Sequence, residues 1–221
     1  MKKGKMISVI IPAYNEAKTI GNTLSNLNLS WLDEIIIVND GSKDNTGEIV
    51  AKYPVKLVDL TRHRGKGKAV EKGINKSRGD IIVLLDADLK ESIREIETLI
   101  KPVVHNDVDI CIGVLPITGG GIGLVRMLAD WGLYFFAGKK MKAPLSGQRV
   151  FKREILDKLI PLDNGYGLEI GMDMKIIKNN ISYQEIECDF RHRITKSDIS
   201  GYLHRGKQFI EIFSTLWHLR H

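Results

Sequence analysis

Residues 81–88 have the sequence Ile-Ile-Val-Leu-Leu-Asp-Ala-Asp, in which an apolar run ends in two carboxylates, Asp86 and Asp88. The uninterrupted apolar run predicts a strand from Ile81 to Leu85 that is buried on both faces. Carboxylates at positions i and i+2 of a strand end can point at one ion, and hard divalent cations prefer oxygen ligands. The alternative is that Asp86 only ends the strand and Asp88 caps a helix suggested by Glu91 to Ile100.

Similar apolar runs occur earlier in the chain, and helical patterns separate them. The expected strands are 7–11, 34–38, 55–60 and 81–85. The expected helices are 15–27, 45–52 and 67–77, and Asp44 is the expected N-cap of the second. This alternation predicts an α/β fold with a doubly wound, mostly parallel sheet and right-handed crossovers. Ligands bind such sheets beyond the carboxyl ends of the strands.

The pattern changes past residue 115, although no linker separates the two halves. Further strands are expected at 109–114 and 182–188. Glycines cluster at 119–123 and precede an apolar helix, and a basic amphipathic helix is expected over 201–220. We therefore expect a single domain over 1–221, with a ligand-binding half (1–115) and an extension (116–221). The last helix is expected to pack on the core or on a second copy in a homodimer, with an anionic membrane surface as the alternative.

Composition limits the partners of the protein. The 33 basic and 27 acidic residues give a net charge of +6, which suits an anionic ligand but also follows from solubility alone. Basic residues are interspersed with acidic ones and no recognition module is present, so a nucleic-acid partner is not expected. Cys111 and Cys188 form no C-x-x-C motif, and neither a signal peptide nor a long apolar span is evident. We expect a cytoplasmic protein that meets a membrane only from the side, at its inner face.

Two loops that follow expected strands carry residues suited to a nucleotide. Asp40, in Asn-Asp-Gly-Ser, either forms a turn or accepts hydrogen bonds from a nucleobase edge, with Glu16 as its strand-end partner. The stretch 62–69 is a basic, glycine-containing approach to a helix N-terminus, where free amides favour phosphate. Lys66 is the preferred diphosphate or base-side contact, and a solvated basic loop is the alternative.

Three residues in the second half are candidates for metal binding or acid–base chemistry. His192 follows an expected strand and is either a surface histidine or a ligand of a divalent ion. Glu169 and Asp173 are four residues apart on an expected helix and therefore share a face. Either is a candidate general base, but an ordinary polar position is favoured for Asp173.

The motifs together resemble the nucleotide-sugar half of family 2-type glycosyltransferases with the GT-A fold. They are 9–16 (VIIPAYNE), 38–42 (VNDGS), 64–67 (RGKG) and 86–88 (DAD), in the family's order. The resemblance implies nucleotide-sugar contacts from Pro12, Ala13, Tyr14, Glu16, Asp40, Gly65, Lys66, Asp86 and Ala87. It also implies that 86–88 is a metal-binding DxD motif for Mg²⁺ or Mn²⁺, with Asp88 as the main ligand and Asp86 beside it.

The second half is similar to glucosyl-3-phosphoglycerate synthases at 144–149 (PLSGQR), 165–171 (GYGLEIG) and 191–193 (RHR). The resemblance implies that His192 joins the metal site. It places acceptor contacts at Gly120, Gly121, Arg126, Ser146 and Arg191. The chain departs from that subgroup where Ile-Gly-Leu-Val-Arg (122–126) replaces its Arg-Val-Thr phosphate-binding segment. Polyprenol-phosphate sugar transferases share the donor motifs and would use the apolar helix after residue 123.

These observations predict an enzyme that moves a sugar, most simply from UDP-glucose, to a phosphorylated or otherwise anionic acceptor. Asp88 and Glu169 are its catalytic candidates. Glu169 would be the base of an inverting reaction, whereas the phosphoglycerate subgroup implies retention without such a base. Alternatives are a polyprenol-phosphate sugar transferase, a non-catalytic nucleotide-sugar-binding subunit and a nucleotidylyltransferase. The last is disfavoured because residues 12–16 lack the glycine-rich, arginine-bearing loop expected there.

Overall fold

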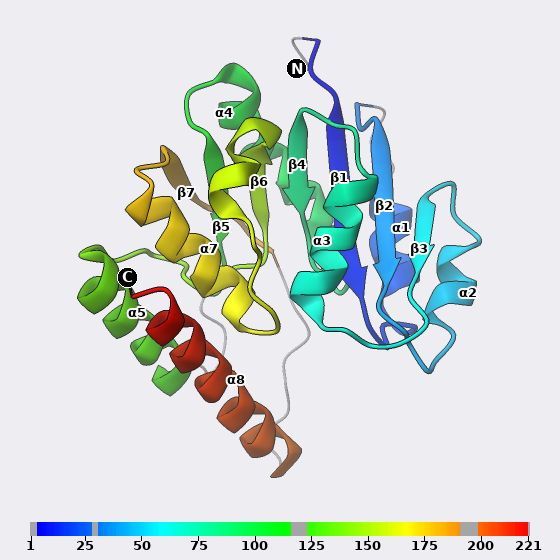
Figure 1. Ribbon diagram of the computed structural model, residues 1–221. Coiled ribbons are helices and arrows are strands. Elements are labelled where there is room, and N and C mark those ends of the chain that lie inside the picture. The colour runs from blue at the N-terminus through cyan, green and yellow to red at the C-terminus, as the bar shows by residue number, and fades with distance from the viewer. Residues whose placement is uncertain (1–3, 28–30, 116–122, 191–198, 221) are drawn as a thin grey trace.

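One seven-stranded sheet runs through the molecule, with helices on both of its faces (Figure 1). The computed structural model describes residues 4–27, 31–115, 123–190 and 199–220. The strand order is β3-β2-β1-β4-β6-β5-β7. The strands are β1 (Ile7–Ala13), β2 (Glu34–Asn39), β3 (Lys56–Asp59), β4 (Ile81–Leu84), β5 (Ile110–Val114), β6 (Arg149–Lys152) and β7 (Tyr183–Glu187).

Every strand pairing is parallel except those of β6, which runs antiparallel to β4 and to β5. The predicted α/β class with a mostly parallel sheet is therefore confirmed. Strand β6 itself was not predicted, because four residues that begin with a buried arginine give no clear apolar run. It comes from the second half of the chain but lies between two strands of the first half, so both halves share one sheet. The division at residue 115 stays a prediction.

The two faces of the sheet are covered by different helices. Ile7, Val9 and Ile11 of β1 pack with residues of α1 and α4, whereas Ile10 packs with α3 and with the C-terminal helices. This alternation follows from the two-residue period of a strand. The helices are α1 (Ile20–Asn26), α2 (Thr46–Val50), α3 (Lys66–Lys76), α4 (Ile96–His105), α5 (Gly123–Ala137), α6 (Leu156–Leu159), α7 (Gly167–Lys178) and α8 (Ile199–His218), with 3₁₀ turns η1 (Lys90–Glu95) and η2 (Arg153–Ile155).

The first helix begins later than predicted, at Ile20 instead of residue 15. Asn15 has a positive φ of 56°, its backbone N–H donates to Ser42 Oγ (2.9 Å) and its side-chain oxygen accepts from the Lys43 amide (2.8 Å). These bonds hold Asn15 in a turn that links the loops after β1 and β2. The N-cap of the next helix, α2, is Asn45 and not Asp44, so that prediction was wrong by one residue. Asp44 still contacts the helix start, because its Oδ1 accepts from the Thr46 amide at 3.1 Å. The N-cap of η1 is Leu89, which makes no side-chain cap bond, so Asp88 is not the N-cap of the helical segment that follows it.

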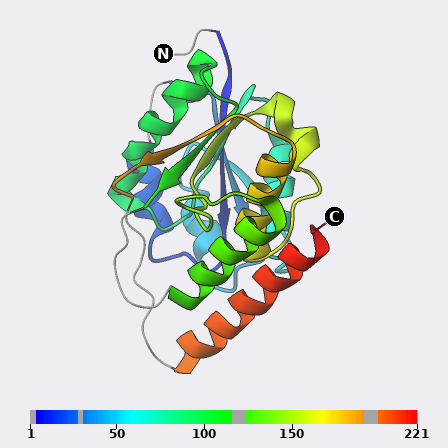
Figure 2. The same cartoon turned by 90° about the vertical axis from the view of Figure 1, so that its left-hand side faces the viewer.

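The predicted C-terminal helix is confirmed as α8, which packs against α5 and α7 and buries Ile212 and Leu216. Figure 2 shows α5 and α8 side by side as an outer pair. Core packing of this helix is thus confirmed, while the dimer and the membrane stay predictions. Within the described parts of the chain, no helix has both the length and the apolarity that a bilayer crossing requires.

Gly73→Ala tests how closely α3 must approach the sheet. A Cβ at Gly73 would lie 2.4 Å from Ile10 Cγ2 and 3.2 Å from Val38 Cγ2. We expect a loss of about 1–3 kcal/mol of unfolding free energy through overpacking, measured by urea denaturation. The matched control is Gly206→Ala on α8, where nothing lies within 4 Å and alanine should stabilise the helix by up to about 1 kcal/mol. An unchanged Gly73→Ala midpoint would contradict the close approach.

Candidate functional site

The carboxyl ends of β1, β2 and β4 meet at one edge of the sheet, because β1 pairs in parallel with both neighbours. Backbone and side-chain bonds tie the loops there together. The Asp40 amide donates to the Ala13 carbonyl (2.8 Å), and the Glu16 amide donates to Thr46 Oγ1 (2.8 Å). The predicted residues Pro12, Ala13, Tyr14, Glu16 and Asp40 are therefore brought close together.

The carboxylate of Asp40 anchors the basic loop that precedes α3. It is 2% exposed and accepts bonds of 2.8 Å each from the backbone amides of Arg64 and Gly65, and its Oδ2 lies 2.8 Å from His63 Nδ1. Gly41, at a φ of +66°, allows this approach, since a Cβ there would lie 2.4 Å from the Arg62 carbonyl carbon. Asp40 thus has a structural role in shaping the loop. Its predicted contact with a nucleobase stays a prediction.

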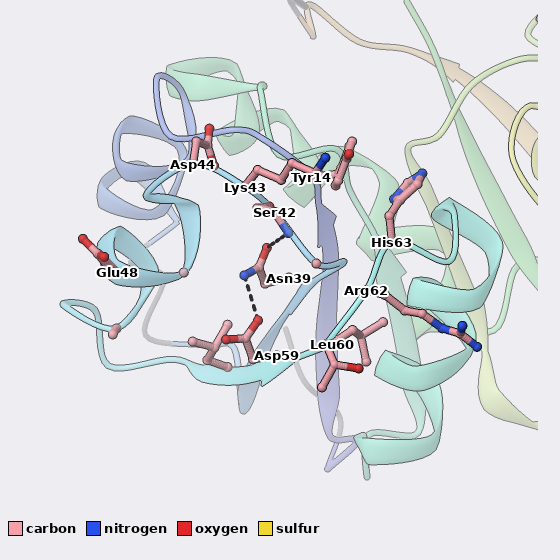
Figure 3. A pocket seen from close by; sticks show the side chains of 15 residues that line it. Tyr14, Asn39, Ser42, Lys43, Asp44, Glu48, Asp59, Leu60, Arg62 and His63 are labelled. Atoms are coloured by element: carbon pink, nitrogen blue, oxygen red, sulfur yellow. Dashed lines mark hydrogen bonds between the residues drawn. The ribbon is translucent and has the colours of Figure 1, made fainter.

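A pocket of about 750 Å³ opens beside this loop (Figure 3). Tyr14 stacks on His63 with ring centroids 4.0 Å apart at one part of its wall, and Asn39 donates to Asp59 Oδ1 (2.8 Å) at another. A flat aromatic pair next to hydrogen-bonding groups suits a planar, polar ligand. His63 was not singled out from the sequence, because its partner Tyr14 is distant along the chain.

The Lys66 ammonium joins three distant segments at the same edge. Its Nζ lies 2.7 Å from Asp86 Oδ1, after β4, and 2.7 Å from Glu169 Oε1, in the first turn of α7. Burial lowers the pKa of Lys66, but the carboxylates of Asp86 and Glu169 outweigh it and raise the pKa above its ordinary value. Lys66 is therefore a permanent cation that brings the predicted base and the first carboxylate of the DxD motif together.

Gln148 is a site residue that the sequence analysis did not single out. It is fully buried, its Nε2 donates to Asp86 Oδ2 at 2.8 Å, and its Oε1 accepts from Ser146 Oγ at 3.2 Å. At the intervening Gly147 a Cβ would lie 2.7 Å from Asp86 Oδ2 and 2.8 Å from Lys66 Nζ, so a larger residue there would displace the ends of these two side chains. Ser146, predicted as an acceptor contact, holds the Gln148 side chain through this hydrogen bond. The sequence signal for Gln148 is the motif 144–149 (PLSGQR), which contains this residue.

Two carboxylates of the DxD motif follow β4, and both are half-buried. Between them Ala87 is buried, and its carbonyl accepts a 2.9 Å bond from Thr23 Oγ1 of α1, which fixes the turn. Carboxylate oxygens at this position fit Mg²⁺ or Mn²⁺, which are held in proteins by one or two carboxylates together with substrate phosphates. The part of the chain that is described contains no cluster of three or more such ligand side chains. The metal role of Asp86 and Asp88 stays a prediction.

Asp173 forms a buried ion pair, so its interpretation as an ordinary polar position was wrong. Its Oδ1 lies 2.6 Å from Arg149 Nη1, and both side chains are at most 1% exposed. Arg149 Nε also donates to the Ser146 carbonyl (2.9 Å), which links the pair to the loop of Gln148. Burial raises the pKa of Asp173 to about 7, and the adjacent guanidinium opposes that shift. The pair joins β6, α7 and the loop that holds Asp86.

Among the remaining predicted residues that the structure describes, Arg126 is not part of this cluster. Arg126 of α5 donates to the Lys142 carbonyl (3.0 Å) and lies 3.8 Å from Asp130. Gly120, Gly121, Arg191 and His192 fall outside the described residues. Their roles in acceptor and metal binding stay predictions.

Arg149→Met tests whether the buried pair holds this part of the site. Loss of the guanidinium leaves a buried carboxyl unpaired, which typically costs about 3–5 kcal/mol of unfolding free energy. Without Arg149 the pKa of Asp173 rises further, so stability is retained at low pH and lost as the pH increases through that raised pKa. Urea denaturation should therefore show a larger loss at pH 8 than at pH 6. The control Lys101→Met removes an exposed pair with Glu97 and should cost at most about 1 kcal/mol.

Comparison with known proteins identifies the family. Residues 8–159 match the family model "Glycosyl transferase family 2". Protein MJ1222 of Methanocaldococcus jannaschii is 34% identical and covers 96% of this chain and 90% of its own length. Dolichol-phosphate mannosyltransferase of Pyrococcus furiosus is 31% identical over 96% of this chain, which corresponds to 63% of the mannosyltransferase.

Solved structures support the same fold. Glucosyl-3-phosphoglycerate synthase of Mycobacterium tuberculosis, in complex with Mn²⁺, UDP and glucosyl-3-phosphoglycerate, has a TM-score of 0.85 to this chain at 23% identity. The alignment covers 99% of this chain and 81% of the synthase. The same synthase has also been crystallised with Mg²⁺ and UDP. The predicted GT-A fold is confirmed, and the chain belongs to glycosyl transferase family 2.

Proposed function

We propose that this family 2 glycosyltransferase transfers a sugar from a nucleoside diphosphate sugar, with UDP-glucose as the first candidate, to a phosphorylated or otherwise anionic acceptor such as 3-phosphoglycerate. The observation that carries the proposal is the cluster of Lys66, Asp86, Gln148 and Glu169 at the carboxyl edge of the sheet. The loop that leads to Lys66 also lines the pocket, through Arg62 and His63. The structurally similar synthase was crystallised with Mn²⁺, UDP and its glucosylated product.

The donor would extend from the pocket to the DxD motif. Tyr14 and His63 offer a flat surface for the base, and Lys66 lies at the N-terminus of α3, where free amides and the helix dipole favour phosphate. Mg²⁺ or Mn²⁺, held by Asp86 and Asp88 with His192 as the predicted third ligand, would neutralise charge on the diphosphate leaving group. Lys66 contributes a second positive charge at the same place, and Gln148 keeps the Asp86 carboxylate oriented.

Glu169 would act on the acceptor. Its carboxylate is 6% exposed and is held by Lys66, which comes from the donor side of the site. A carboxylate fixed there can take the proton of an acceptor hydroxyl as the new glycosidic bond forms. That role corresponds to an inverting reaction.

Polyprenol-phosphate sugar transfer is the second candidate. It is favoured by exposed aromatic side chains on α5 and α8, since both helices pack against α7, which carries Glu169. The similarity to a dolichol-phosphate mannosyltransferase over 96% of the chain points in the same direction. Both candidates share the donor site and differ in the acceptor. Parallel assays with 3-phosphoglycerate and with a detergent-solubilised polyprenyl phosphate separate them.

Isothermal titration of UDP-glucose and of GDP-mannose, each with and without Mn²⁺, tests the donor site. We expect UDP-glucose to bind in a Mn²⁺-dependent manner, because the metal links the diphosphate to the carboxylates. Asp88→Asn should remove the Mn²⁺ dependence, whereas Asp157→Asn, at an exposed position of α6, should not. Binding of neither donor, or equal Mn²⁺ dependence in both variants, would contradict the proposal.

Glu169→Gln tests the base. The amide preserves size and can still accept a bond from Lys66, but it cannot take a proton. We expect turnover to fall by on the order of a hundredfold or more with donor affinity unchanged, measured by release of the nucleoside diphosphate. Glu71→Gln on α3, which removes an exposed pair with Lys68, is the matched control. A nearly unaltered rate would show that Glu169 is not the base. It would favour a retaining reaction that uses no enzymic base.

A further inference from the structure

The outer sides of α5 and α8 carry large apolar side chains that are open to solvent. Eight of the eleven exposed large hydrophobic residues in the described chain lie on these two helices, each between 44% and 69% exposed. They are Met127, Trp131, Tyr134 and Phe135 on α5 and Phe209, Ile210, Phe213 and Trp217 on α8. We call these eight residues the α5–α8 surface. Such a concentration is unusual for a surface that contacts only water.

The two helices that carry these residues are in direct contact. Their contact is close at Gly132 of α5, where a Cβ would lie 2.1 Å from Leu216 Cδ1 of α8. Trp131 precedes Gly132, and Trp217 follows Leu216, so exposed rings border the junction from both sides. Trp131 stacks on Phe135 (5.2 Å between centroids), and Phe213 stacks on Trp217 (6.3 Å). Figure 2 shows the two helices side by side on the outside of the molecule.

The charges around the α5–α8 surface are positive. Arg220 lies over the Trp217 ring at 3.7 Å, and Lys140 lies over the Tyr134 ring at 5.5 Å. The two helices contain only two acidic residues, Asp130 and Glu211. Asp130 is near Arg126 (3.8 Å), and Glu211 accepts a bond from the Tyr166 amide (2.9 Å). A partner of this surface must therefore be apolar at its centre and negative at its edge.

We propose that the α5–α8 surface lies on an anionic lipid bilayer. Tryptophan and tyrosine favour the membrane–water interface, where an apolar ring and a polar tip are both accommodated. Phenylalanine and isoleucine enter the boundary between headgroups and acyl chains, and flanking lysine and arginine pair with anionic headgroups. Because α7 packs against both helices, the bilayer lies one helix away from Glu169. The proposal does not depend on which sugar or acceptor the enzyme uses.

Vesicle flotation tests this proposal with vesicles of phosphatidylcholine alone and of equimolar phosphatidylcholine and phosphatidylglycerol. We expect the full chain to float with the anionic vesicles and much less with the neutral ones, and high salt to weaken the binding. The double variant Phe135→Ser, Ile210→Ser should lower the partition coefficient by about tenfold or more through lost apolar burial. Lys140→Ser with Arg220→Ser should lower it by a similar factor on anionic vesicles only.

Matched controls distinguish binding through the α5–α8 surface from non-specific adsorption to vesicles. Met127→Ser should reduce flotation, whereas Met6→Ser, at an exposed methionine before β1, should not. Lys52→Ser with Lys72→Ser, at exposed positions elsewhere, should leave binding unchanged apart from the small effect of net charge. Circular dichroism checks that every variant is folded, and isothermal titration of UDP-glucose checks the donor site independently.

Three outcomes would overturn the proposal. One is equal flotation of the wild type and the Phe135→Ser, Ile210→Ser variant. Another is equal binding to neutral and anionic vesicles. The third is a dimer in analytical ultracentrifugation that the same double variant dissociates, with neither protein bound to vesicles, because a second copy would then cover the α5–α8 surface.

Discussion

The parallel pairing of β1 with both β2 and β4 is the constraint on which the site depends. Strands that run in the same direction end at the same edge, so the loops after all three must meet there. The loops are then locked by a few bonds, from Asn15 to Ser42, from Glu16 to Thr46 and from Asp40 to the loop before α3. The pocket and the DxD motif lie at the same edge of the sheet because of this arrangement.

Ion pairs position further side chains at the edge where these strands end. Lys66 holds Asp86 and Glu169 although 103 residues separate Lys66 from Glu169 in sequence. A lysine between two carboxylates neutralises charges that would otherwise repel at a partly buried site. Gln148 and the buried Arg149–Asp173 pair then fix the loop that faces Asp86. The carboxylates of Asp86 and Glu169 are thus held by Lys66 of α3, and Asp86 is also held by Gln148 in the loop before β6.

Helix α7 connects two surfaces with different chemistry. Its first turn contributes Glu169 to the polar site, while its contacts with α5 and α8 support an outer layer with exposed aromatic rings. A transferase of this fold needs a polar, charged environment for the donor diphosphate. Helices α5 and α8 lie outside the polar site, so their exposed side chains can be apolar and aromatic.

The sequence by itself determined every strand except β6, the mostly parallel character of the sheet and the positions of the motifs at the strand ends. Apolar runs and helical periodicity are local signals, and the strand ends follow from them. Tertiary structure decided the rest. The insertion of β6, the burial of Asp173 against Arg149 and the contacts of Gln148 and His63 depend on residues that are far apart in the chain. No short-range pattern encodes such contacts, because a polar residue has the same local signature whether its partner is water or a buried side chain.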